Sequence, residues 1–189
     1  MSKQVPLILG IDPGPTISGW CLLRGTKYLC GDQSYNHEVF RALSVVHGNA
    51  FQDVDVIGIE WMENYGQVVG QSIFKTCAWV GRYEAAVGFY DNAAKVKRVQ
   101  RSHVKLHLCR TARAKDVNVR HALVGLWGDD MKSVKGTKNK KGPLYGIKEH
   151  VWSALAVAVT VRDLGAENAP PLIGEETIGD GMKMWEQLI

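Results

Sequence analysis

The stretch GIDPGPTISGW, residues 10–20, places an aspartate between two apolar runs. Residues 5–11 lead up to Asp12 and residues 17–23 follow it, and both are dominated by apolar side chains. Short apolar runs bounded by turn residues predict buried strands. The Pro-Gly pair after the aspartate favours a tight turn without bulky side chains, so a ligand can approach the carboxylate closely. We therefore expect Asp12 to end a buried strand beside a ligand.

A second carboxylate has a similar position in DVIGIEWMENYG, residues 55–66. Residues 54–60 are predicted to form a strand that ends at Glu60. Ligand sites in α/β sheets lie at strand ends, and two buried carboxylates there are costly unless a cation binds them. Oxygen ligands without thiols suit Mg²⁺ or Mn²⁺. Asp12 and Glu60 are therefore candidate metal ligands; the alternatives are a turn-capping aspartate and a solvated strand end.

Further residues of the candidate metal site are expected from the last apolar helix, which begins within GIKEHVWSALAVAVT, residues 146–160. Glu149 and His150 stand at its N-terminal end, ahead of a run rich in Ala and Val. A helix that packs on the two strands would aim these polar side chains at the edge of the sheet. The alternative for His150 is an ordinary residue of a first helical turn.

The net charge of +4 is modest, but the basic residues are concentrated in two windows. Residues 93–115 contain eight lysines and arginines, residues 131–148 contain six, and neither window has an acidic residue. The rest of the chain has 9 of the 23 basic residues and all 19 acidic ones. Such segregation is typical of a face that binds a polyanion such as nucleic acid. The alternative is a solvated loop and a solvated helix face.

The length of 189 residues and the hydrophobic content of 46% fit one globular domain. No apolar run approaches the roughly 18 residues of a membrane span, so we expect neither a membrane-spanning helix nor a signal peptide. The four cysteines lack CxxC spacing, which favours reduced thiols in a cytoplasmic protein over a zinc site.

Strands followed by helices mixed with further strands predict an α/β domain with a mixed sheet. The lysine-rich segment before Pro143 is expected to be a mobile loop, because it has glycines and few apolar residues. The remaining expected elements are strands at 26–30 and 94–99 and helices at 36–47, 68–90, 102–109, 116–127 and 151–164.

Three motifs in this order and spacing resemble the RuvC family of Holliday-junction resolvases, part of the ribonuclease H-like superfamily. They are LGIDPGPTISGW, IGIEWMENYG and KEHVWSALAVAVT, and the resemblance covers residues 7–163. The segment VKLHLCRTARAKDVNVRHAL is most similar to RuvC-like proteins of bacteriophages and prophages. The resemblance implies a central mixed five-stranded sheet flanked by helices, with a nuclease domain over residues 1–164 and an acidic tail over residues 165–189.

The resemblance also implies an activity. A RuvC-like protein would be a structure-selective endonuclease that cleaves Holliday junctions by two-metal-ion hydrolysis with Mg²⁺ or Mn²⁺. It would work as a homodimer, because a four-way junction has near two-fold symmetry. Its location would be a bacterial or phage-infected bacterial cytoplasm. The helix at 68–90, with Phe74, Ala78 and Trp79, is a candidate interface element. Two alternatives stay open: a catalytically weakened or inactive junction binder, and a ribonuclease H-like nuclease acting on hybrids or replication intermediates.

Residue by residue, Asp12 matches the first-strand aspartate of the family, Glu60 the fourth-strand glutamate, and His150 the first ligand position of the last helix. Ser153 stands where the cellular family usually has aspartate, so one metal position loses a charge, and Glu149 is a further candidate. Tyr65 would stack on an unpaired base or, alternatively, cover the edge of the core. The DNA-binding candidates are Tyr65, Lys105, Arg113, Lys115, Lys138, Lys140 and Lys141.

Overall fold

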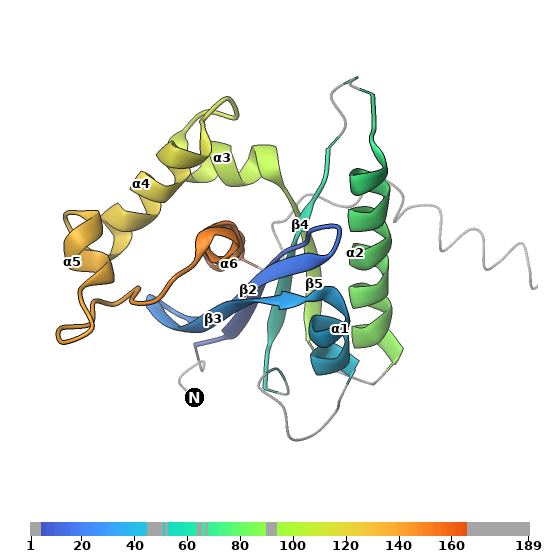
Figure 1. The fold of residues 1–189 in the computed structure, drawn as a ribbon, viewed down its shortest axis with the longest axis horizontal. Coiled ribbons are helices and arrows are strands. Elements are labelled where there is room, and N and C mark those ends of the chain that lie inside the picture. Colours follow the sequence, from blue (N-terminus) through green and yellow to red (C-terminus); the bar gives the residue numbers. More distant parts are fainter. Residues whose placement is uncertain are drawn as a thin grey trace, which may run out of the picture.

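The computed structural model describes residues 5–44, 51, 53–63, 66, 68–89 and 94–165, and a five-stranded mixed sheet lies at its centre. The strands are β1 (Leu7–Asp12), β2 (Ile17–Arg24), β3 (Lys27–Tyr35), β4 (Val56–Trp61) and β5 (Lys95–Gln100). They lie in the order β3-β2-β1-β4-β5 (Figure 1). The strand β2 is antiparallel to both neighbours, whereas β4 and β5 run parallel to β1. The predicted α/β class with a mixed five-stranded sheet is confirmed.

Helices cover both faces of this sheet. They are α1 (Asn36–Ser44), α2 (Gln71–Phe89), α3 (Arg101–Cys109), α4 (Asp116–Trp127), α5 (Met131–Lys135) and α6 (Glu149–Leu164). One face packs against α1 and α2, and the other against α6, with α3 and α4 beside it (Figure 1). The C-terminal ends of the helices predicted at 36–47 and 68–90, and most of the predicted tail, lie outside the described residues. The helix α2 begins at Gln71, three residues later than predicted. None of the described helices is long and apolar enough to cross a membrane.

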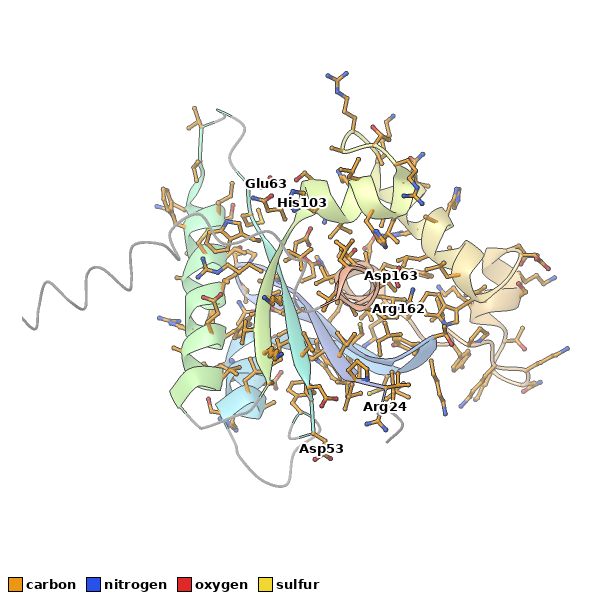
Figure 2. The ribbon with its side chains drawn as sticks, turned by 180° about the vertical axis from the view of Figure 1, so that it is seen from behind. Arg24, Asp53, Glu63, His103, Arg162 and Asp163 are labelled. Atoms are coloured by element: carbon orange, nitrogen blue, oxygen red, sulfur yellow. The ribbon has the colours of Figure 1, made fainter. Side chains whose placement is uncertain are left out.

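The helix α6 is buried on almost every side, which explains its composition. Its buried residues run from Val151 to Val161, and Ser153 is the partly exposed exception. A helix that is apolar all round needs cover on all sides. The sheet covers one side, and side chains of the neighbouring helices fill the others (Figure 2).

Glycines in the sheet allow α6 to lie directly on the strands. A Cβ atom on Gly10 would lie 2.2 Å from the carbonyl oxygen of Ala154, and one on Gly19 would lie 2.4 Å from that of His150. These contacts are possible only without a side chain. The close approach fixes the first turn of α6 at the end of β1 that carries the aspartate.

We expect Gly10→Ala to destabilise the protein by about 1–3 kcal/mol, because helix and strand backbones must separate to admit the methyl group. Thermal denaturation should show a lower Tm. Gly88→Ala in α2 is the matched control, since a Cβ atom there meets nothing within 4 Å. Alanine favours helix over glycine by about 1 kcal/mol, so this control should keep or raise the Tm. An unchanged Tm for Gly10→Ala would contradict the packing described here.

The lysine-rich segment, predicted as a mobile loop, begins with a short helix and continues as a loop that one bridge closes. It contains α5, which begins with a capping box in which the Asp130 side chain accepts a hydrogen bond from the Ser133 N–H at 2.7 Å. A bridge joins Gly136 to Lys141 behind it. Val134 is fully buried in the core. The low number of apolar residues did not indicate this helix, because one or two buried apolar side chains are enough to hold so short an element on the core.

Candidate active site

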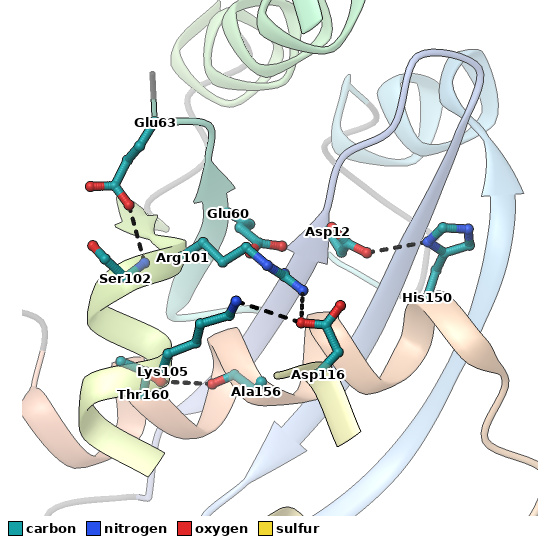
Figure 3. A network of polar contacts seen from close by, with 10 residues as sticks. All are labelled: Asp12, Glu60, Glu63, Arg101, Ser102, Lys105, Asp116, His150, Ala156 and Thr160. Atoms are coloured by element: carbon teal, nitrogen blue, oxygen red, sulfur yellow. Dashed lines mark hydrogen bonds and ion pairs between the residues drawn. The ribbon is translucent and has the colours of Figure 1, made fainter. Parts of the chain in front are cut away.

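Asp12 is the last residue of β1 and Glu60 the last but one of its parallel neighbour β4, so their carboxylates meet at one edge of the sheet (Figure 3). In the register of β1 and β4, Ile11 pairs with Ile59, and the next residue of each strand is the acid. Glu60 is only 3% exposed, and Asp12 is half-buried. The strand order thus brings together two acids that lie far apart in the sequence.

Burial raises the pKa of both carboxyl groups. For Glu60 burial is the largest cause, the neighbouring Asp12 adds to it, Arg101 opposes it, and the pKa is raised to about 8. Burial also raises the pKa of Asp12, although Glu60, Arg101 and the Ser153 hydroxyl oppose the increase. A cation bound between the acids would favour the charged form of both. The pair is therefore built to receive positive charge.

The N-terminus of α6 brings His150 and Ser153 to the same place. The His150 Nδ1 lies 3.4 Å from Asp12 Oδ2, and the histidine side chain is 58% exposed. Ser153 lies one helical turn further along and lines the same cleft. The carboxylate of Glu149 lies 3.5 Å from Arg120, and its side chain is 80% exposed. Glu149 therefore stands at the rim of the cleft, paired with an arginine.

These residues surround an open cleft of about 500 Å³. Its wall includes the Asp12-Pro-Gly turn, the end of β4 and the first turn of α6, together with Thr76 of α2. The turn after Asp12 contributes no bulky side chain, as the sequence indicated. The cleft is therefore open to a large ligand above the two acids.

Sequence reasoning missed two members of this site, Arg101 and Asp116. Arg101 Nη1 lies 2.5 Å from Glu60 Oε1, and Arg101 Nη2 lies 2.7 Å from Asp116 Oδ1 (Figure 3). The sequence pattern marks Arg101 only as part of a basic window and Asp116 only as the start of a predicted helix. The order of the elements could have indicated the contact. Arg101 directly follows β5, which runs parallel to β4, so it lies at the same edge of the sheet as Glu60.

The donor set fits a divalent ion, although no group of three His, Cys, Asp or Glu side chains in the described part of the chain could hold one as it stands. The cation beside Glu60 is the guanidinium of Arg101. Carboxylate oxygens with an imidazole nitrogen and no thiolate suit Mg²⁺ or Mn²⁺. Asp12, Glu60 and His150 are the residues that would bind it.

Some basic residues of the two windows are neutralised by acids from other parts of the chain. Arg98 pairs with Glu84, and Lys148 Nζ lies 2.6 Å from Asp32 Oδ1. Arg101 pairs with Glu60 and Asp116. A charge count within a window cannot show such partners. The uncompensated positive charge is therefore smaller than the sequence indicated.

The candidate DNA contacts lie in two places. Lys105 is half-buried, with its Nζ 3.8 Å from Oδ1 of Asp116, a residue that lines the cleft. Lys115 is the exposed N-cap residue of α4 and directly precedes Asp116 in the sequence. Arg113 is exposed nearby in sequence. The exposed residues Lys138, Lys140 and Lys141 belong to the segment after α5. Tyr65 lies outside the described residues.

A mixed five-stranded sheet of this order, with helices on both faces, is the ribonuclease H-like fold. Among solved structures, the chain is similar to RuvC of Thermus thermophilus, with 20% identity and a TM-score of 0.59 over 84% of this chain and 94% of that one. It is also similar to T. thermophilus RuvC in complex with a Holliday junction substrate, with 21% identity and a TM-score of 0.55 over 82% and 92%. The chain has the fold of RuvC. Comparison with protein-family models and with curated proteins finds no match.

Proposed function

We propose that the protein is a divalent-metal-dependent endonuclease that cleaves branched DNA, chiefly four-way junctions. The observation that supports this most is the buried acid pair of Asp12 and Glu60 in an open cleft, with His150 beside it. The fold adds support, because a similar protein, T. thermophilus RuvC, has been solved with a Holliday junction substrate.

Hydrolysis of a phosphodiester needs an activated water and a stabilised leaving oxygen. Two Mg²⁺ or Mn²⁺ ions held by Asp12, Glu60 and His150 would supply both. The protein's own residues do the remaining work. The buried carboxylates provide fixed negative charge, the Ser153 hydroxyl offers a neutral oxygen, and Lys105 adds positive charge on the side where a phosphate would approach. No covalent enzyme intermediate is required.

We further propose a two-fold homodimer, because a four-way junction presents two equivalent strands. The outer side of α2 is the candidate interface. Phe74 is 65% exposed there, Ala78 is exposed and Trp79 is half-buried, and large exposed apolar side chains commonly mark contact surfaces. A protein of phage or prophage origin in the bacterial cytoplasm would meet such junctions during recombination.

The test is incubation of the purified protein with synthetic four-way junctions, linear duplex and RNA–DNA hybrid, each with Mg²⁺ or Mn²⁺. Symmetric nicks in the junction, little cleavage of the duplex or hybrid, and no cleavage with chelator would support the proposal. Preferential cleavage of the hybrid would favour a general ribonuclease H-like nuclease. Tight junction binding without cleavage under any condition would favour a junction-binding protein.

Neutralising Lys105 and Lys115 should reduce the salt dependence of junction binding. Each phosphate contact releases counterions, so the slope of log K against log[salt] should fall by roughly one per lost contact, or about two for Lys105→Gln with Lys115→Gln. Junction affinity measured from 50 to 200 mM salt gives this slope. Arg24→Gln with Lys27→Gln is the matched control, since both lie at the end of the sheet opposite Asp12. Equal slopes in the two double variants would remove the lysines from the DNA interface.

A further inference from the structure

Arg101 occupies an unusual position in the cleft, between a buried acid and an exposed one. Its guanidinium binds Glu60, whose side chain is 4% exposed, and Asp116, whose side chain is 64% exposed. The arginine side chain itself is 37% exposed. One planar group therefore connects the floor of the candidate metal site to its mouth (Figure 3).

The two contacts differ in strength because the two acids differ in burial. A buried carboxylate has lost its hydration and depends on a charged partner, whereas an exposed carboxylate is solvated and gains little from an ion pair. Glu60 therefore provides the main reason for Arg101 to lie deep in the cleft. Once another cation binds Glu60, the carboxylate no longer needs the guanidinium. Arg101 can then leave Glu60 and keep its contact with Asp116.

We propose that Arg101 competes with a divalent ion for Glu60, and that Asp116 is the residue to which the displaced guanidinium stays bound. This inference rests on the proposed metal-dependent function and assigns Arg101 and Asp116 as positioning residues of its site. Two cations at one carboxylate repel each other, so binding of the ion and retention of the Arg101–Glu60 contact oppose each other. The displaced arginine, held by Asp116 at the mouth of the cleft beside Lys105, then faces an incoming phosphodiester.

The competition has a measurable size. If Arg101 holds Glu60 in about nine molecules of ten, the apparent dissociation constant of the ion is weakened about tenfold, because only the free fraction binds. Removing the guanidinium should therefore tighten metal binding, although it removes an ion pair. The same change should weaken junction binding. A purely structural role of Arg101 predicts loss of both.

The test measures Mn²⁺ affinity by calorimetry or by electron paramagnetic resonance, independently of cleavage. Arg101→Gln should bind Mn²⁺ about tenfold more tightly than the wild type. Arg101→Lys, which keeps the charge but cannot bridge two carboxylates, should lie between them. Arg98→Gln is the matched control: it breaks an arginine–carboxylate pair with Glu84 on α2, on the other face of the sheet, and should leave Mn²⁺ affinity unchanged.

Asp116 is tested by a double-mutant cycle. Asp116→Asn should weaken Mn²⁺ binding in the wild-type background, because a displaced guanidinium then has no carboxylate to bind, whereas a guanidinium on Glu60 keeps one. In the Arg101→Gln background the same substitution should have little effect, and an undiminished effect there would overturn the assigned role of Asp116. Mn²⁺ binding that is unchanged or weaker in Arg101→Gln overturns the competition while leaving the proposed function standing. If neither protein binds Mn²⁺, both the competition and the metal-dependent function fail.

Discussion

Asp12→Asn is expected to abolish junction cleavage while leaving junction binding close to that of the wild type. The substitution removes one of the two carboxylates that would hold the catalytic ions, and it leaves the candidate DNA contacts Lys105 and Lys115 unchanged. Metal ions supply several kcal/mol of transition-state stabilisation, so cleavage should fall by about 10³-fold or more. Single-turnover cleavage measures the first effect and an electrophoretic binding assay the second. Cleavage near the wild-type rate would remove Asp12 from the active site.

The same variant should be more stable than the wild type when metal is withheld. A raised carboxyl pKa means that the folded protein binds more protons than the unfolded chain, so stability falls as pH rises between the two values. For Glu60 that window runs from its ordinary value of 4.5 to about 8. Replacing Asp12 by asparagine removes a charge that raises the pKa of Glu60, so the gain in Tm should be larger at pH 8 than at pH 5.

Asp163→Asn is the control with the opposite sign. Asp163 lies near the C-terminal end of α6, away from the cleft (Figure 2). Burial raises its pKa, but hydrogen bonds from Arg162 and His107 outweigh burial, and the pKa is lowered. A carboxyl group with a lowered pKa stabilises the fold above its unfolded value and loses that contribution as pH falls. Asp163→Asn should therefore lower the Tm at neutral pH and leave cleavage unchanged.

The parts of the fold that follow from local pattern could be predicted from the sequence. Apolar runs that end in an acid located β1 and β4, and the Ala- and Val-rich run located α6. The strand β3 continues to Tyr35, beyond the predicted 26–30. Its second half could not be predicted from an apolar pattern, because it carries polar residues and lies at the edge of the sheet. An edge strand has one unpaired side and need not show an apolar pattern.

The site could be predicted only in part, because its members meet through strand order. The sequence placed Asp12 and Glu60 at strand ends, and the parallel pairing of β1 with β4 brings them together. It gave no reason to connect Arg101 to Glu60, because that contact depends on β5 lying next to β4. Counting charges within windows treated Arg101 as one of many surface cations. Its partners, 41 and 15 residues away, become visible only in three dimensions.

His150→Ala is expected to lower both Mn²⁺ affinity and cleavage by about 10- to 100-fold. Removing a group that binds a metal ion, or that orients a ligand of the ion, typically has an effect of this size. His150 would be the third metal ligand of the cleft. Its Nδ1 lies 3.4 Å from Asp12 Oδ2, and the exposed imidazole can turn toward an ion without disturbing the core. Glu149→Gln is the matched control on the same helical turn, since Glu149 pairs with Arg120 at the rim. A large loss in Glu149→Gln with none in His150→Ala would exchange the two roles.

Ser153→Asp tests whether serine limits activity at a position where the RuvC family, which the sequence resembles, usually has aspartate. The added carboxylate would stand beside two acids whose pKa values are already raised, so without metal the variant should have a lower Tm than the wild type. With Mg²⁺ the same charge becomes an additional ligand, so metal affinity should rise, and cleavage should equal or exceed that of the wild type. This outcome would mean that Asp12, Glu60 and His150 suffice and that serine is tolerated at position 153. If the wild type cleaves with neither metal and Ser153→Asp creates cleavage, the protein is a junction binder that has lost one essential carboxylate.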